Sequence, residues 1–374
     1  MHLRRLLALS LFGLTGSSAT LAQTSPPSPA SINAAEQNSV IATLGQQLKS
    51  QYVFPNVAAK TAAALSARAA HGDYRDANTT TAFAKVLSRD LRSIGNDKHF
   101  AVKYAPDLST PPSDDKSAVD KAPTPQEIAQ MIAQMRSASA RESYGISDIQ
   151  WLPGDVSYID LRSLGHPEIV GAAFDSAISL VAGTKALILD LRQNHGGEPD
   201  GVAYLLSHFF AEGDARHLND IYYRADNSTH QFWTIPSATP RFTGPIYVLT
   251  SHHTGSAAEE CAYDLQTQKR ATLVGETTVG AANPGGWFPL GHGFMAFISG
   301  ARAINPITKT NWEHVGVKPD VEVPASSAMK TAYVTILNDL LKKSKDAHEQ
   351  TGLKSILARV QSDKFQLPAY YPPL

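Results

Sequence analysis

The chain has 374 residues with 33 basic and 34 acidic side chains, which gives a formal net charge of −1 at pH 7. A near-neutral chain without a clustered basic face does not favour nucleic-acid binding. Its single cysteine, Cys261, excludes an internal disulfide framework, and a chain of this length buries a sizeable core without one. We expect the Cys261 thiol to be an inert core residue.

The first 22 residues are typical of a secretory signal peptide. Arg4 and Arg5 precede an apolar run at 6–16, and small residues follow up to Ala22. The run is shorter than the roughly 20 residues that span a bilayer. We therefore expect cleavage after Ala22, export to a bacterial periplasm or secretion, and no membrane span afterwards. Loss of the two arginines leaves a net charge of about −3.

The next parts of the chain predict a linker and a helical lobe. Residues 23–34 are rich in Pro and Ser and too poor in large apolar groups to pack. Residues 35–140 follow as a helical lobe and connector, because the apolar residues of 82–94 fall on one helical stripe. Gly95 is a natural end for that helix. A capping box at 124–127 predicts another helix through Met135.

Residues 141–374 predict an α/β core with C-terminal helices, because short apolar runs alternate with helical segments. The expected strands are 156–161, 186–189, 246–249 and 272–274. The expected helices between them are 167–181, 199–210 and 256–268.

A candidate nucleophile, Ser256, lies between a buried strand at 246–249 and a helix. This position exposes a side-chain oxygen and places free N–H groups, including that of Ala257, beside it, which favours a developing oxyanion. The alternative is that Ser256 is only an N-cap.

A second segment, 186–197, ends a strand in a polar turn with the paired glycines Gly196 and Gly197. Paired glycines let a backbone approach a substrate closely, and their N–H groups could supply a second oxyanion donor. The alternative is a plain turn in which Asp190 and Arg192 form a structural ion pair.

In order and separation these segments resemble the C-terminal processing peptidase and tricorn-core family, in the branch with the interphotoreceptor retinoid-binding protein modules. Three further stretches fit the same pattern, and they lie at residues 97–100, 274–278 and 311–320. The resemblance covers about residues 35–325 and implies a tricorn-core or crotonase-like α/β fold of mixed sheet and helices with an N-terminal helical lobe.

The resemblance implies Ser256 as the nucleophile and Ala257 with Gly196 or Gly197 as oxyanion donors. Ala281 stands where the processing peptidases carry a lysine base, so the chain resembles the tricorn variant. In that variant a histidine, here matched by His99, is the base, and an acid, matched by Glu313, supports it.

One position departs from that pattern. The tricorn arrangement has a serine just before the histidine, whereas this chain has Lys98. Either Glu313 reaches the imidazole directly, or Lys98 helps to hold Glu313, or catalysis is weaker than in the family's best members. His252 and His253 are expected at the cleft rim, and their spacing to Glu259 and Glu260 does not match a zinc-binding helix.

The sequence thus predicts an exported serine peptidase that acts on peptides or proteins and uses no metal and no cofactor. Two alternatives stay open. One is a non-catalytic module that binds an apolar ligand or a peptide on the same scaffold, and the other is a serine esterase. The oligomeric state is not predicted.

Overall fold

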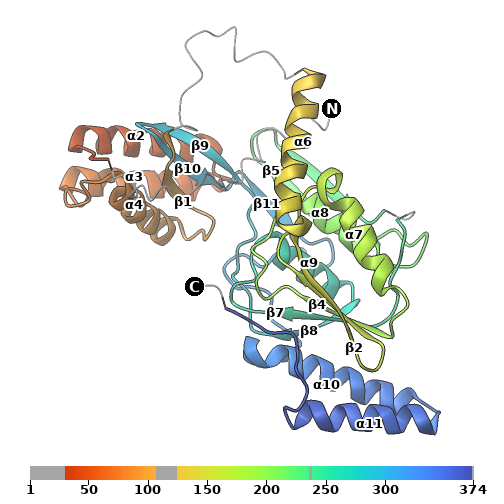
Figure 1. Cartoon of the computed structure of the whole chain (residues 1–374). Coiled ribbons are helices and arrows are strands. Elements are labelled where there is room, and N and C mark those ends of the chain that lie inside the picture. The colour runs from red at the N-terminus through yellow and green to blue at the C-terminus, as the bar shows by residue number, and fades with distance from the viewer. Residues whose placement is uncertain (1–29, 107–123, 236–237, 373–374) are drawn as a thin grey trace, which may run out of the picture. The chain divides into compact units, whose positions relative to one another are not determined.

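The computed structural model describes residues 30–106, 124–235 and 238–372 (Figure 1). The expected signal peptide and most of the expected linker lie outside these residues. The chain forms two compact units, and each is described by itself. Of the described residues, one unit contains those up to 128 together with 222–229 and 283–302, and the other contains those of 129–221, 230–282 and 303–372.

The first unit combines three helices with a three-stranded antiparallel sheet in the order β1-β10-β9. Its elements are α2 (Ala34–Gln51), α3 (Pro55–His71), α4 (Thr80–Gly95), β1 (Ala101–Tyr104), β9 (Gly286–Gly291) and β10 (Phe294–Ile298). Helix α4 has the predicted stripe, with Phe83, Leu87 and Leu91 fully buried. Gly95 is its last residue, and the left-handed cap is Asn96, at φ 49°.

The β9–β10 hairpin belongs to this unit although the sequence placed its residues in the α/β core. Phe294 packs edge-on against Phe83 of α4, with ring centroids 5.4 Å apart. Phe288 of β9 packs against the core of this unit as well.

The second unit is built on a six-stranded sheet in the order β12-β8-β7-β4-β3-β2. Strand β2 pairs antiparallel with β3, and the other neighbours are parallel. The strands are β2 (Ile146–Leu152), β3 (Val156–Leu161), β4 (Ala186–Asp190), β7 (Ile246–Thr250), β8 (Ala271–Gly275) and β12 (Val321–Glu322). Strands β3, β4 and β7 are buried throughout, as expected for parallel strands covered on both faces.

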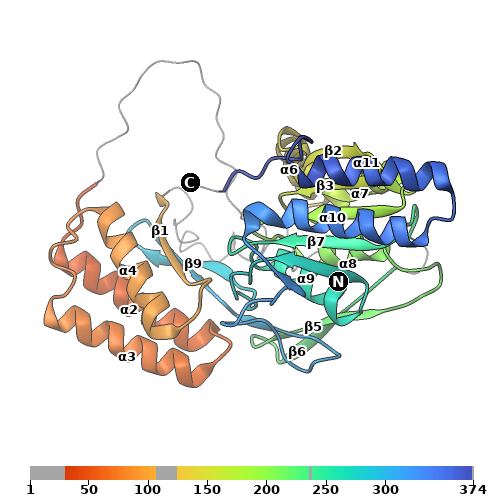
Figure 2. The same cartoon turned by 90° about the horizontal axis from the view of Figure 1, so that it is seen from below.

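Helices cover both faces of this sheet, as Figures 1 and 2 show. One face packs against α7 (Pro167–Val181), α8 (Pro199–Ser207) and α9 (Ala257–Thr267). The other packs against α10 (Ala325–Lys343), and α11 (Ala347–Gln361) lies beside α10. The predicted α/β architecture is confirmed. Helix α8 ends three residues earlier than predicted, because the chain turns at His208 and buries Phe209 and Phe210 outside the helix.

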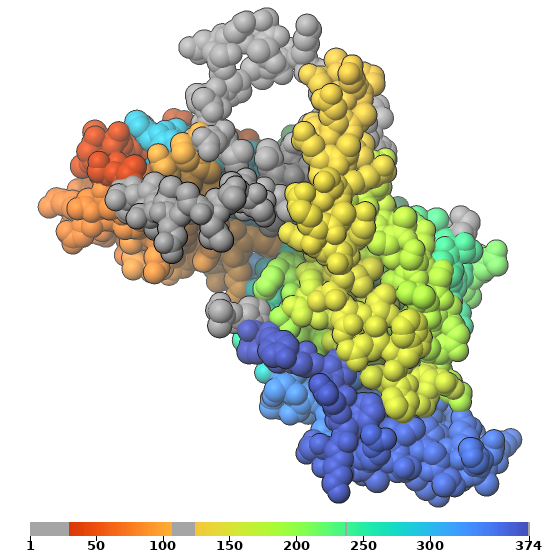
Figure 3. Space-filling model, in the orientation of Figure 1, coloured from red at the N-terminus to blue at the C-terminus, as the bar shows by residue number. Residues whose placement is uncertain are grey.

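The remaining elements of the described residues are a second three-stranded sheet, one further helix and a short 3-10 helix. The sheet has the order β11-β5-β6, formed by β5 (His217–Tyr223), β6 (Ser228–Trp233) and β11 (Ala301–Ile304). Helix α6 (Pro125–Arg141) is six residues longer than predicted and leads through η2 (Ser143–Gly145) into β2. Its side chains are largely exposed, and they form a yellow column in the space-filling view (Figure 3). Among the described helices, none combines the length and apolar character that crossing a membrane would require.

Candidate active site

Ser256 lies between β7 and α9, in a backbone conformation that L-residues rarely adopt. Its φ is 55° and its ψ is −125°. An ordinary N-cap has extended dihedrals, so a cap alone does not account for this conformation. Strain of this kind gathers at functional sites, and a strained strand-to-helix turn is the geometry that presents a catalytic serine in other hydrolases.

Gly196 lies directly against the turn of Ser256. A Cβ added at Gly196 would lie 2.7 Å from the Ser256 Cβ and 3.0 Å from the Ala257 backbone nitrogen. The φ of Gly196 is 113° and that of Gly197 is 150°, both in the region that favours glycine. The structure therefore brings two of the three predicted oxyanion residues, Gly196 and Ala257, beside Ser256, and Gly197 follows Gly196 in the chain and packs against Leu164.

The N–H groups of the two glycines differ in their partners. The Gly196 N–H donates to Asn194 Oδ1 at 2.9 Å. Gly197 forms a parallel bridge with Leu164, in which Leu164 N–H donates to the Gly196 carbonyl and Glu198 N–H donates to the Leu164 carbonyl. In such a bridge the N–H of the central residue points away from the partner strand. Gly197 is thus better suited than Gly196 to donate to a substrate.

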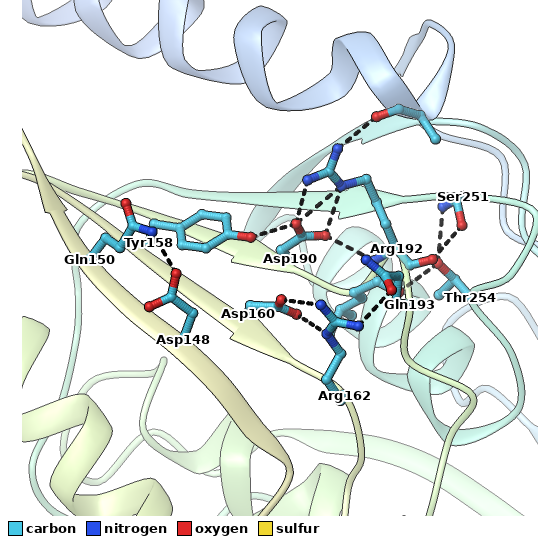
Figure 4. A network of polar contacts seen from close by, with 12 residues as sticks. Asp148, Gln150, Tyr158, Asp160, Arg162, Asp190, Arg192, Gln193, Ser251 and Thr254 are labelled. Carbon is cyan, nitrogen blue, oxygen red and sulfur yellow. Dashed lines mark hydrogen bonds and ion pairs between the residues drawn. The ribbon is translucent and has the colours of Figure 1, made fainter. Parts of the chain in front are cut away.

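A network of polar contacts surrounds the end of β4, a few residues before these glycines in the chain (Figure 4). Asp190 and Arg192 form a bidentate ion pair with nitrogen–oxygen distances of 2.6 to 3.1 Å, and the Tyr158 hydroxyl donates to Asp190 at 2.8 Å. Ser251 Oγ donates to the Arg192 carbonyl, and Thr254 Oγ1 donates to the Leu191 carbonyl. The structural ion pair expected as an alternative exists. The Ser251 and Thr254 hydroxyls tie the segment before the glycines to the loop before Ser256.

Asn194 was not singled out from the sequence. Its Nδ2 donates to the Leu161 carbonyl at 3.0 Å, and its backbone carbonyl accepts the Gly255 N–H at 3.0 Å. Because its Oδ1 also accepts the Gly196 N–H, one buried side chain and its backbone fix β3, the glycine loop and the Ser256 turn together. Only its place just before the paired glycines could have pointed to it.

Glu313 belongs to the same unit as Ser256. Its side chain is 8% exposed, and its Oε2 accepts the Ala282 N–H at 2.5 Å. His314 Nδ1 lies 3.4 Å from the other carboxylate oxygen. Asn311 Oδ1 accepts the Glu313 N–H at 2.9 Å, which fixes the turn that carries the carboxylate.

His99 belongs to the other unit, in the turn between α4 and β1. Asp97 Oδ1 accepts the His99 N–H at 2.9 Å and lies 3.8 Å from Nδ1 of the ring. The imidazole stacks on Phe297 with centroids 5.9 Å apart. Burial lowers the pKa of His99, and the Asp97 charge opposes this shift. Neighbouring Lys98 is exposed.

The other residues singled out have structural surroundings of their own. Cys261 is fully buried among apolar side chains, which raises the pKa of its thiol and fits the expected inert role. His252 is exposed, and its Nδ1 lies 2.7 Å from Glu276 Oε2. His253 lies against His252 with ring centroids 4.0 Å apart.

Comparison with known families gives two matches. The model described as peptidase family S41 matches residues 155–323. The model described as the N-terminal domain of Peptidase_S41 in eukaryotic IRBP matches residues 33–146.

Curated relatives are similar over part of the chain. The chloroplastic carboxyl-terminal-processing peptidase 2 of Arabidopsis thaliana is 32% identical over 180 residues, which cover 46% of this chain and 32% of the relative. The carboxy-terminal-processing protease of Bartonella bacilliformis is 26% identical over 231 residues, which cover 58% of this chain and 51% of the relative. The chain thus spans about a third to a half of the length of these relatives.

Solved structures share the fold. Mature CPAF in complex with lactacystin has a TM-score of 0.54 and 12% identity, covering 88% of this chain and 99% of that one. A lipoprotein from Streptococcus agalactiae has a TM-score of 0.51 and 13% identity, covering 85% of this chain and 100% of that one.

Proposed function

The chain belongs to peptidase family S41, and we propose that it is a serine peptidase that cleaves peptide bonds through Ser256. The single observation that carries this proposal is the strained backbone of Ser256 with Gly196 packed against it. A plain helix cap needs neither feature. Relatives named for C-terminal processing suggest C-terminal segments of peptides or proteins as the substrate class.

In the proposed mechanism, His99 takes the proton of the Ser256 hydroxyl and returns it to the leaving amine. Glu313 holds the imidazole in the required tautomer. The N–H groups of Ala257 and Gly197 stabilise the oxyanion. Support for the neutral imidazole comes from the lowered pKa of His99, because a base must be unprotonated at working pH. No metal or cofactor enters this mechanism.

We also propose that the protein is exported, on the basis of the leader sequence at residues 1–22. Arg4 and Arg5, the apolar run and the small residues before Ala22 support this part of the proposal. The N-terminal sequence of the protein recovered from an exporting cell tests it. We expect that sequence to begin at Gln23, and a protein that retains its first 22 residues in the cytoplasm would contradict export.

Labelling with a fluorophosphonate probe tests the nucleophile. The mature protein should be labelled on Ser256, with no label on the Ser256→Ala variant. Ser176→Ala is the matched control, because Ser176 is an exposed helical serine of the same unit, and it should label like the wild type. A wild type that hydrolyses no peptide or ester and takes up no label would favour the binding-module alternative. A labelled protein that cleaves esters but no peptide would favour the esterase.

A further inference from the structure

Glu259, two residues after the first residue of α9, has an unusual set of partners for a buried carboxylate. It is 0% exposed. Its Oε2 accepts the Ser256 N–H and the Ala281 N–H, both at 2.9 Å. Its Oε1 accepts the Gly280 N–H at 2.5 Å and the Thr278 hydroxyl. Four donors, two on each oxygen, fill the acceptor capacity of an ionised carboxylate.

A capping box alone explains only one of these four bonds. In a capping box the third helical residue accepts the N–H of the cap residue, here Ser256. The other three donors come from the loop at 278–281, on a separate segment of the chain. Burial raises the pKa of Glu259 to about 7, and the four donors act in the opposite direction. Burial removes water from the Glu259 carboxylate, which disfavours its charged form. The carboxylate therefore depends on these four donors to stay ionised.

The same loop also contacts the turn that carries Glu313. The next residue, Ala282, donates its N–H to Glu313 Oε2 at 2.5 Å. The Trp312 indole donates to the Ala281 carbonyl at 3.2 Å, and the His314 N–H donates to the Gly280 carbonyl at 3.0 Å. Glu259 therefore stands between the backbone of Ser256 and the segment that fixes Glu313.

We propose that Glu259 is a positioning residue for hydrolysis. Through one carboxylate it holds the Ser256 backbone in place relative to the loop that contacts the Glu313 turn. This inference rests on the proposed function. Glu259 does not touch substrate in this role. It acts through Ser256 and through the 278–282 loop, so its loss should slow the chemical step and leave substrate binding nearly unchanged.

Glu259→Gln tests the inference, because the amide group keeps the size of the side chain but replaces one acceptor oxygen with donors that face N–H or O–H groups. A displacement of the order of 1 Å costs about 100-fold in rate. We expect kcat and the rate of fluorophosphonate labelling to fall by about 100-fold, with KM changed by less than about threefold.

Glu260→Gln is the matched control. Glu260 is the adjacent acid of α9 and is 4% exposed, and burial raises its pKa to about 7 as well, although the Asn219 side chain opposes this. Its side chain shares the burial of the Glu259 side chain but has none of the four hydrogen bonds described above. We expect kcat within about threefold of the wild type.

The outcomes separate this inference from the proposed function. If the wild type labels on Ser256 and Glu259→Gln keeps its kcat, the inference is wrong and the proposed function stands. Equal losses in both variants would also overturn it, because burial of an acid would then explain the effect. If the wild type takes up no label, both fail. Should Glu259→Gln not fold, Thr278→Val removes one of the four donors, together with the acceptor of the Val317 N–H. An unchanged kcat in that variant would contradict the inference.

Discussion

Ser256 and His99 both lie in short turns beside a regular element, but the two turns are fixed in different ways. The Ser256 turn has a strained backbone, with φ at 55°, which costs on the order of 1–3 kcal/mol. The His99 turn is held by a side-chain bond from Asp97 to the His99 N–H. The next residue, Phe100, is fully buried in the core of the helical unit.

The Ser256 turn thus depends on backbone geometry, whereas the His99 turn depends on packing. A strained residue persists only where its surroundings over-determine it, and around Ser256 these are Gly196, Asn194 and Glu259. The His99 turn is held in place by the buried Phe100 side chain. Burial of the His99 imidazole itself lowers the pKa of that imidazole. Changes near Ser256 should therefore act on kcat through geometry, whereas changes near His99 should act through proton transfer.

The largest effect should come from Ser256→Ala, which removes the proposed nucleophile. We expect kcat to fall by at least about 10⁴-fold. The alanine keeps the strained backbone and at worst loses a cap, so the free energy of unfolding should change by about 1 kcal/mol. Peptide hydrolysis and urea unfolding measure the two. If Ser256→Ala retains most of the peptidase activity, Ser256 is not the nucleophile.

His99→Ala should lose activity nearly as completely, because the base and the nucleophile act as one unit. Lys98 is the competing base, since a desolvated lysine can titrate near neutrality. Its exposed position predicts that Lys98→Ala keeps kcat within a few-fold. The two single variants are compared in one hydrolysis assay. If Lys98→Ala is inactive and His99→Ala stays active, a serine–lysine mechanism replaces this one.

Much of the fold could be predicted from the sequence, and the exceptions have physical reasons. The apolar runs of β4 and β7 and the largely apolar β3 predict strands, because parallel strands are buried on both faces. The hairpin of β9 and β10 was missed as part of the helical unit. Its contacts with α2 and α4 are far apart in sequence, and no local pattern indicates them.

The site was predictable in composition but not in geometry. The strand-to-helix junction pointed to Ser256, and the paired glycines pointed to a loop. Neither pattern reveals that Gly196 touches the Ser256 turn, because that contact joins two separate strand ends. A signal for Glu259 was present in the Ser-Ala-Ala-Glu run at 256–259, which is a capping-box sequence. Its three loop donors could not be predicted.

Gly196→Ala disturbs the geometry of the Ser256 turn without removing any proposed catalytic group. The added Cβ would meet the Ser256 Cβ at 2.7 Å, so the turn or the glycine loop must shift. We expect a loss of kcat of about 100-fold, similar to that for a displaced oxyanion donor. Gly183→Ala is the control, because nothing lies within 4 Å of its added Cβ. Equal kcat values for the two variants would contradict the close fit.

Glu313→Gln should have a smaller effect, because the amide can still accept the Ala282 N–H but no longer carries the charge that supports the imidazolium. We expect kcat to fall by less than in Ser256→Ala and His99→Ala, with KM nearly unchanged. Glu322→Gln, at an exposed acid of the same unit, should leave kcat unchanged. A normal kcat for Glu313→Gln would show that another group orients His99.

The smallest effect concerns the acid limb of the pH–rate profile. Burial lowers the pKa of His99, so the imidazole stays neutral, and able to accept a proton, below its ordinary pKa of about 6.5. Asp97 is the group that opposes this shift, because its charge favours the imidazolium. Asp97→Asn keeps the Oδ1 that accepts the His99 N–H but removes the charge.

We therefore expect Asp97→Asn to move the acid limb of kcat/KM to lower pH by less than about one unit. Stability should follow the same sign. Below about pH 6.5 the unfolded chain binds a proton at His99, whereas the folded chain does so only at lower pH. The free energy of unfolding should therefore decrease as the pH falls from about 6.5 to the folded-state pKa of His99. Glu259 could add a limb near pH 7, but the Asp97 change should leave that limb in place. If the limb below about pH 6.5 moves upward in Asp97→Asn, or does not move, His99 is not the titrating base.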